Sequence, residues 1–478
     1  MRKNATHPKT LRIFFATEMW ERYGFYVVQT LLALYLALHF NWPDKAVYEL
    51  VGSFTALTYL SPVIGGWIAD HLIGQKRAIL LGAIVLLLSY FSLSLIMSNH
   101  MLCGCLAGIV VGTGLLKPNI SSLLGNEYPE GSLNRESGFT IFYMGLTAGI
   151  VLGTTLPSYL SDHFGWSRAF LSASFGMVLA CFVFTYGIWI YRIKDYRGYT
   201  FSSRNIALAA LLMIGLWGGS FYILNYPRLA DFVFVLVAVL SVIYFVSCIR
   251  KESKSQAKRT IVIGLLCLIS VMFWAFYFQM FTSLTLFIVR VVDPTVFGIS
   301  FPPPYYVGIQ SVGMIILGLL LSRSKPVLSP KQQIVRVGNK FLLSMVCMTI
   351  AYGLIAVICH FHFPFGLLSP LYVIPAYLVI SLAELLLSPV GLSAVTVLAS
   401  RKRVSTMMGI FFVSLGIGGF LSGKLAIITA VSFESLSLVN LKAHYSHSFL
   451  LLLFVLMGAT LVCGFLNLLI RKLTYAET

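Results

Sequence analysis

The sequence predicts an all-α polytopic membrane protein with fourteen transmembrane helices. Of its 478 residues, 58% are hydrophobic and only 10% are charged, whereas a soluble domain carries about 25% charged residues. Apolar runs of about 20 residues recur from end to end, and each is long enough to span a bilayer. Polar and apolar residues do not alternate along these runs, which excludes a transmembrane β-barrel.

The apolar runs place the helices in order along the chain. The predicted spans are 12–40, 47–69, 78–98, 101–125, 138–160, 167–191, 205–225, 230–249, 260–290, 304–322, 339–361, 368–399, 404–432 and 447–470. The polar stretches between them are too short for a soluble domain. If the spans 205–225 and 230–249 are an inserted pair, the others form two groups of six, a common plan for transporters. We therefore expect a six-helix bundle in 1–195, the inserted pair with its linkers in 196–258, and a second bundle in 259–478.

The positive charge is sorted between the two sides of the predicted membrane. Of the 34 Lys and Arg residues, 26 lie on the side of the two termini, five on the opposite side and three within spans. Basic loops stay cytoplasmic, which predicts that both termini are cytoplasmic in a multi-pass cell (inner) membrane protein. The net charge of +18 therefore indicates topology and contact with anionic lipid, not nucleic-acid binding.

Five ionisable residues inside apolar runs mark the functional region. They are Glu18, Glu21, Arg22, Lys117 and Glu384. A charge at membrane depth costs a few kcal/mol, so such residues usually face a wet cavity. The first three share one helix face, at spacings i, i+3 and i+4. A structural salt bridge is the alternative interpretation, but one pair would need two residues and not three.

The positions of these charges suit a zwitterionic cargo and a proton relay. Arg22 and Lys117 both lie roughly 15 Å from the inner ends of their helices, and an arginine fork binds a carboxylate. Glu384, in the other half, can accept an ammonium group. A carboxylate whose proton affinity is set by burial and a nearby lysine can load and release a proton, which makes Glu18 or Glu21 beside Lys117 a candidate relay.

The segment 66–77 resembles the G-x-x-x-D-R-x-G-R-R loop of the major facilitator superfamily, with one extra residue and His71 for the usual arginine. Its matching residues are Gly66, Asp70, Gly74, Lys76 and Arg77. The glycines permit close approach of helices, and Asp70 can accept hydrogen bonds that break as the two halves move. A generic cytoplasmic turn is the alternative.

Four motifs in order resemble those of the proton-dependent oligopeptide transporter family, bacterial type. EMWERYGFY at 18–26 resembles E-x-x-E-R-F-x-Y-Y, and GLLKPNIS at 114–121 matches G-x-x-K-P-N-I-S. SGFTIFYMG at 137–145 resembles F-x-I-F-Y-M-G-I-N, and ELLLSPVG at 384–391 matches E-x-x-x-S-P-x-G. The resemblance implies a major facilitator fold with two extra helices, and symport of di- and tripeptides with protons by alternating access.

The resemblance also implies roles for individual residues. Arg22 and Lys117 would hold the peptide carboxylate, and Glu384, with Ser388 near it, the peptide amine. Glu18 and Glu21 would carry the proton together with Lys117. The residues expected to line the pocket are Tyr59, Tyr143, Thr147 and Trp274.

Several positions depart from the family pattern and bear on the cargo. Phe25 and Thr147 stand where the family has a tyrosine and an asparagine, and Phe411 where it has a tryptophan. Gln29 and Phe278 replace an arginine and a glutamate that pair in some members. Fewer polar contacts to a peptide backbone leave an alternative open, namely the same fold and coupling with amino acids or another small organic ion as cargo.

Other function classes find no support in the sequence. There is no nucleophile set, metal-ligand spacing or sensor domain, so we expect neither an enzyme nor a receptor, with no cofactor, no metal and a proton gradient as driving force. The eight cysteines are expected to be free packing thiols, and the chain to be a monomer. Lys424 is expected to reach the outer surface, with a pair to Glu434 or Asp293 as the alternative.

Overall fold

The computed structural model describes residues 7–96, 98–128, 134–195, 202–321, 330–361, 366–400, 403–431 and 437–475. The helices in these ranges are α1 (Leu11–Leu34), α2 (Asp44–Ile68), α3 (Gln75–Leu93), α4 (Asn99–Asn126), α5 (Asn134–Phe164), α6 (Trp166–Tyr191), α7 (Ser203–Asn225), α8 (Pro227–Lys251), α9 (Lys254–Tyr277), α10 (Ser283–Val291), α11 (Pro304–Leu321), α12 (Pro330–Phe361), α13 (Pro370–Leu398), α14 (Val404–Ala426) and α15 (Leu438–Tyr475). Short helical turns are η1 (Tyr35–His39), η2 (Ala69–Ile73), η3 (Phe278–Phe281) and η4 (Ile427–Thr429), and the strands β1 (Thr295–Val296) and β2 (Ile299–Ser300) form a hairpin.

The predicted all-α membrane fold is confirmed. Twelve helices among the described residues are long and apolar enough to cross a membrane. The two remaining predicted spans are also helical: α1, which carries the three charged residues of its buried face, and the shorter α11. Every one of the fourteen apolar runs therefore coincides with a helix.

The helix boundaries differ from the prediction where polar residues are helical. α12 begins at Pro330 instead of residue 339, and α15 begins at Leu438 instead of residue 447. Hydropathy detects the apolar part of a helix and misses a polar extension beyond it. The predicted span 260–290 is also divided, since α9 passes into η3 and then α10 at Thr282, whose φ and ψ of −128° and −99° are not helical.

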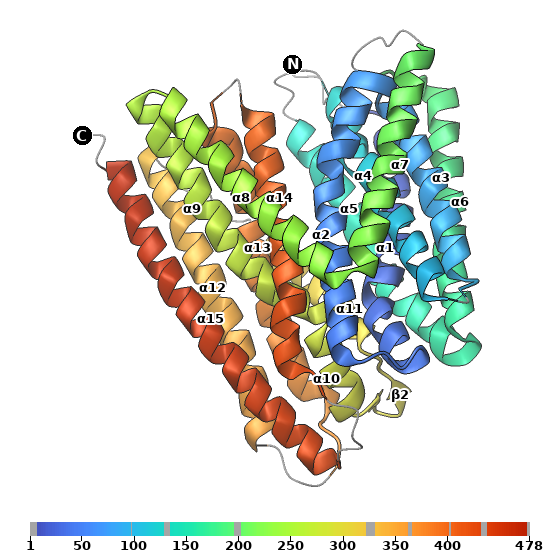
Figure 1. The fold of residues 1–478 in the computed structure, drawn as a ribbon, viewed down its shortest axis with the longest axis vertical. Coiled ribbons are helices and arrows are strands. Elements are labelled where there is room, and N and C mark those ends of the chain that lie inside the picture. Colours follow the sequence, from blue (N-terminus) through green and yellow to red (C-terminus); the bar gives the residue numbers. More distant parts are fainter. Residues whose placement is uncertain are drawn as a thin grey trace, which may run out of the picture. The chain divides into compact units, whose positions relative to one another are not determined.

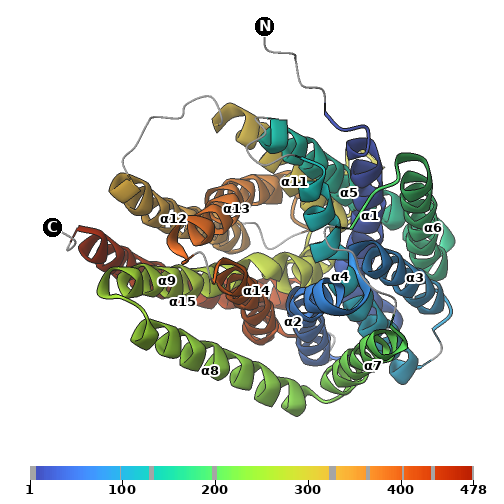
Figure 2. The same ribbon diagram turned by 90° about the horizontal axis from the view of Figure 1, so that it is seen from above.

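The chain forms two compact units that do not follow sequence order. Unit 1 contains residues 1–32 and 57–227, and unit 2 contains residues 33–56 and 228–478. Helix α2 is continuous through this boundary, so its first half belongs to unit 2. The predicted inserted pair is likewise divided, because α7 lies in unit 1, next to α4, and α8 lies in unit 2 (Figures 1 and 2).

Small residues position the charged face of α1 within unit 1. A Cβ on Gly149 of α5 would lie 2.8 Å from the Cβ of Arg22, and one on Gly145 would lie 2.8 Å from the carbonyl oxygen of Phe15. Glycine at such contacts lets helix backbones approach closely. α5 therefore packs directly beside the charged face of α1.

Helix packing in unit 2 brings α11 against α13. The Ser381 hydroxyl of α13 donates to the carbonyl oxygen of Gln310 on α11, at 2.7 Å. A Cβ on Gly313, one turn further along α11, would lie 2.8 Å from that same hydroxyl oxygen. This close contact directs the Gln310 side chain toward Glu384, one turn along α13. On the other side of α13, α12 runs beside both α13 and α15 (Figure 1).

The glycine-containing loop between α2 and α3 is a tight, ordered turn. α2 passes into the π-helical turn η2, and Gly74 adopts a φ of 84°, which a residue with a side chain rarely adopts. The backbone N–H of Lys76 donates to Asp195 Oδ1 at 2.9 Å, and an Arg77 guanidinium nitrogen lies 3.5 Å from the Ile73 carbonyl oxygen. A Cβ on Gly66 would lie 3.8 Å from Pro118, so α2 and α4 are in contact here.

Candidate functional site

In unit 1, Arg22 lies between the two carboxylates of its own helix. Its Nε atom is 3.0 Å from Glu18 Oε1 and 2.5 Å from Glu21 Oε2. The three residues are 3% exposed or less. One cation faces two carboxylates, so the three residues together carry one excess negative charge when all are ionised.

The buried ionic groups retain unused hydrogen-bonding capacity. Arg22 Nη2, Glu18 Oε2 and Glu21 Oε1 make no hydrogen bond to any residue that the structure describes. Buried polar atoms are nearly always hydrogen-bonded in folded proteins. Unused donors on a guanidinium suit a carboxylate ligand, and unused carboxylate oxygens suit a proton.

Lys117 of α4 adds the second positive charge to this region. Its Nζ atom lies 4.4 Å from the centroid of the Tyr59 ring on α2, a cation–π contact. Lys117 also interacts electrostatically with Arg22, Glu21 and Glu18. The two carboxylates and two cations of this cluster have a net charge of zero when all four are ionised. Binding of a proton or of an anion would therefore change the net charge of the cluster.

Helix α5 contributes the aromatic ring of Tyr143 and the hydroxyl of Thr147 to this region. Tyr143 interacts electrostatically with Glu18 and Arg22, which places it beside the cluster. The Thr147 hydroxyl donates to the Tyr143 carbonyl oxygen at 3.1 Å, and Thr147 is buried. Because this hydroxyl is already used within its own helix, Thr147 offers a ligand less polarity than its residue type suggests.

In unit 2, Glu384 is held by two neutral donors on one oxygen. Glu384 Oε2 accepts from Tyr277 Oη at 2.9 Å and from Gln310 Nε2 at 2.7 Å. No lysine or arginine in the described part of the chain forms an ion pair with Glu384. A carboxylate inside a helical membrane protein without a cationic partner is a candidate site for a cation.

Two other predicted residues lie near Glu384. Trp274 packs edge-on against Tyr277, with ring centroids 4.8 Å apart, and its indole N–H has no hydrogen-bond partner among the described residues. Ser388 follows Glu384 by one turn of α13 and is half-buried. Trp274 therefore lies beside the Tyr277–Glu384 contact, and Ser388 lies one turn further along α13.

Sequence reasoning missed Tyr277 and Gln310. Tyr277 lies in a run of aromatic residues, and such a run is as typical of a packing face as of a binding site. Gln310 stands where the family motif is not evident, yet a glutamine in an apolar span was itself a signal that a polar partner lies nearby.

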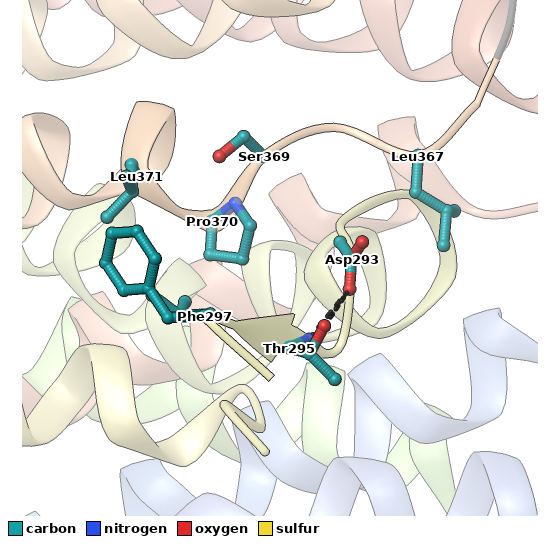
Figure 3. A pocket seen from close by; sticks show the side chains of 8 residues that line it. Asp293, Thr295, Phe297, Leu367, Ser369, Pro370 and Leu371 are labelled. Atoms are coloured by element: carbon teal, nitrogen blue, oxygen red, sulfur yellow. Dashed lines mark hydrogen bonds between the residues drawn. The ribbon is translucent and has the colours of Figure 1, made fainter. Parts of the chain in front are cut away.

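The pocket shown in Figure 3 is not this site. It is lined by Asp293, Thr295, Val296, Phe297, Leu367, Ser369, Pro370 and Leu371, at the hairpin and the beginning of α13. None of the predicted site residues lines it. Asp293 Oδ1 accepts from both the backbone N–H and the hydroxyl of Thr295, at 2.8 Å each, so this carboxylate stabilises the hairpin.

The structure gives Lys424 two partners that the sequence expectations did not name. Its side chain is 30% exposed and pairs with Glu49 at 3.1 Å and with Asp231 at 2.7 Å. Asp293 is bonded to Thr295, and Glu434 lies outside the described residues. The sequence does not indicate the pair with Glu49, because Glu49 and Lys424 are 375 residues apart.

Comparison with known proteins gives a consistent result. The POT family profile (PTR2) matches residues 76–442. The chain is 30% identical over 459 residues to dipeptide and tripeptide permease A of Klebsiella pneumoniae (strain 342), covering 93% of this chain and 88% of the relative. It is 29% identical over 431 residues to dipeptide and tripeptide permease B of Edwardsiella piscicida, covering 89% and 87%.

Solved structures agree with these sequence relatives. A structure reported as "Structural insights into substrate recognition in proton dependent oligopeptide transporters" matches with a TM-score of 0.84 and 27% identity, covering 97% of this chain and 99% of the other. A crystal structure of tetrameric PepTSo2 matches with a TM-score of 0.85 and 26% identity, covering 97% and 99%.

Proposed function

The chain belongs to the POT family, and on that premise we propose that it is a proton-coupled symporter, located in the inner membrane, that takes up di- and tripeptides by alternating access. The family is one of transporters, so the protein is not an enzyme. Its relatives include dipeptide and tripeptide permeases, which indicates the class of cargo.

One observation carries the assignment of the cargo's amine. Glu384 is a carboxylate inside a membrane helix whose partners are the neutral donors Tyr277 and Gln310. A cargo that brings an ammonium group would complete this site. The low polarity of the surrounding membrane helices would strengthen the ion pair relative to one in water.

The opposite end of the peptide is assigned to unit 1. Arg22 Nη2 has no hydrogen-bond partner among the described residues, and the Lys117 ammonium group contacts a ring instead of a carboxylate. Both cations can therefore bind a peptide carboxylate. Tyr59, Tyr143 and Thr147 would line the peptide site beside these cations, and Trp274 and Ser388 would line it beside Glu384.

The proton is assigned to the α1 carboxylates. Glu18 and Glu21 face one guanidinium, and Lys117 supplies the charge that balances the second carboxylate. When a peptide carboxylate recruits Arg22 and Lys117, the α1 carboxylates lose part of their compensation and gain affinity for a proton. Binding of peptide and proton is thereby coupled.

The remaining assignments concern architecture. The two moving bundles would be residues 1–195 and 259–478, with 196–258 inserted between them and both termini cytoplasmic. The loop residues Gly66, Asp70, Gly74, Lys76 and Arg77 would form contacts that change during rocking. No cofactor is needed, since the proton gradient supplies the energy. One chain contains all the site residues, which supports a monomer as the functional unit.

Uptake of a radiolabelled dipeptide into reconstituted vesicles tests the function. We expect accumulation only with an inward proton gradient, and its collapse with a protonophore. A second cargo class, amino acids, is favoured by the Thr147 hydroxyl bonded within α5, because it leaves fewer groups to bind a peptide bond. Accumulation of single amino acids without competition by any peptide would establish this alternative.

A further inference from the structure

Lys424 has two carboxylate partners on two different helices. Its Nζ atom on α14 lies 3.1 Å from Glu49 Oε1 on α2 and 2.7 Å from Asp231 Oδ1 on α8. The Lys424 and Glu49 side chains are 30% and 15% exposed, and that of Asp231 is 48% exposed. All three belong to unit 2. One ammonium group therefore has one more counter-ion than it needs.

Two glycines bring the backbones of α2 and α14 close together. A Cβ on Gly52 of α2 would lie 2.8 Å from the Cα of Gly423 on α14, and one on Gly423 would lie 2.5 Å from the Tyr48 carbonyl oxygen. Glu49 follows Tyr48 and precedes Gly52 by less than one turn. The Glu49–Lys424 pair thus borders a place where the backbones of α2 and α14 approach closely.

Contacts between the α8 and α14 segments are found near both ends of α8. Phe234 of α8 is 1% exposed, and its ring centroid lies 4.6 Å from that of Phe420. Asp231 precedes Phe234 by one turn, and Lys424 follows Phe420 by one turn, so both contacts lie on one face of each helix. Beyond the far end of α8, Glu252 pairs with Arg403, the residue before α14, at 3.2 Å.

The two carboxylates therefore differ in how they are attached. Glu49 is on a helix that continues into unit 1 beyond residue 56. Asp231 is on a helix bound to α14 near both of its ends. In alternating access one bundle moves against the other, which would separate α2 from α14 at the side where α2 begins, while α8 and α14 stay together.

We propose that Lys424 loses Glu49 as a counter-ion when α2 moves away from α14, and that it keeps Asp231 as a counter-ion throughout the transport cycle. When α2 moves away, Lys424 keeps Asp231, so no unpaired ammonium is left at the edge of the membrane, which would be costly. The inserted helix α8 thereby makes opening easier. This inference rests on the proposed transport function.

A double-mutant cycle on the conformational equilibrium tests the inference. Spin labels at Lys45 and Asn440, both exposed, report separation of α2 from the other helices of unit 2 in a cysteine-free protein. We expect Asp231→Asn to lower the ratio of open to closed protein about fivefold, because opening then removes the only counter-ion of Lys424. Glu49→Gln is expected to raise this ratio.

The decisive comparison is Asp231→Asn in the Glu49→Gln background. There we expect no further change, since opening no longer breaks an ion pair of Lys424. Asp231→Glu, which keeps the charge, is expected to behave as the parent, and the melting temperature of each variant checks folding. The inference is overturned if Asp231→Asn changes the ratio of open to closed protein equally in the parent and in the Glu49→Gln variant. It is also overturned if Asp231→Asn has no effect on this ratio in the parent.

The proposed function fails in a different way. The distances are measured without cargo, so absence of peptide uptake with an intact cycle would refute the function and not the role of Asp231. A single distance in every variant, also with peptide and at acidic pH, would overturn both alternating access and this inference.

Discussion

Arg290 of α10 binds Asp44 of α2 through both terminal guanidinium nitrogens, at 2.6 and 2.7 Å. Asp44 also accepts from the backbone N–H of Val431 at 2.9 Å, and Arg290 donates to Tyr445 Oη at 3.1 Å. A bidentate arginine–carboxylate pair is among the stronger polar contacts in proteins. This contact and the Lys424–Glu49 pair together fasten the first half of α2 to unit 2.

Replacing Asp44 is expected to destabilise the protein. Asp44→Asn removes the charge from a carboxylate whose side chain is 3% exposed and leaves Arg290 without its counter-ion, at a cost of about 3 kcal/mol. Thermal unfolding in detergent measures the effect. Asp293→Asn is the matched control, because the Asp293 carboxylate accepts hydrogen bonds from the nearby, neutral Thr295. Equal melting temperatures for the two variants would contradict this account of the pair.

Replacing Lys117 is expected to separate substrate exchange from proton coupling. Lys117→Ala removes the charge that balances the second carboxylate of the α1 cluster, so gradient-driven uptake is lost while counterflow of labelled substrate persists. Tyr59→Phe serves as the control, because it keeps the ring beneath the ammonium group. Acid-driven accumulation at the normal level by Lys117→Ala would remove Lys117 from the coupling mechanism.

Replacing Glu384 is expected to affect cargo with a free amine selectively. Glu384→Gln removes the proposed partner of the ammonium group, a loss of about 2–3 kcal/mol or roughly 30- to 150-fold in affinity. N-acetylated peptides lack that charge and are expected to change little. Competition against a labelled dipeptide measures both. Equal losses for the two peptide types would assign Glu384 to another task, such as proton transfer.

The two donors to Glu384 are expected to contribute by positioning its carboxylate. Tyr277→Phe and Gln310→Leu each remove one hydrogen bond to Oε2, and each is expected to weaken binding of free-amine peptides about tenfold. Neither is expected to add to the loss in a Glu384→Gln background, because the carboxylate is already gone. Additive losses there would mean that Tyr277 and Gln310 bind the cargo directly.

The small number of polar groups expected at the proposed peptide site predicts a preference for hydrophobic dipeptides over tripeptides. Thr147 uses its hydroxyl within α5, whereas an asparagine amide can both donate and accept. Thr147→Asn is therefore expected to broaden the range of peptides that compete for uptake, with Thr147→Val as the control that leaves the range narrow. Polar tripeptides that compete as well as leucine- or phenylalanine-containing dipeptides in the parent protein would refute the preference.

The membrane class, the fourteen membrane helices and the charged face of α1 could all be predicted from the sequence. These features are local: an apolar run has a length, and Glu18, Glu21 and Arg22 share a face because of helical periodicity. The charges of Lys117 and Glu384 inside apolar runs predicted that both residues belong to the site, and the four motifs added the family and the expected role of each residue.

The pairing of the helices and the contacts between distant side chains could be seen in the tertiary structure alone. Asp44 and Arg290 are 246 residues apart, and Tyr277 and Glu384 are 107 apart. Nothing local in the chain encodes such contacts, because they depend on where glycines such as Gly52 and Gly423 let backbones approach. The two partners of Lys424 emerged for the same reason: hydropathy reports how deep a charge lies, whereas packing between distant helices selects its counter-ion.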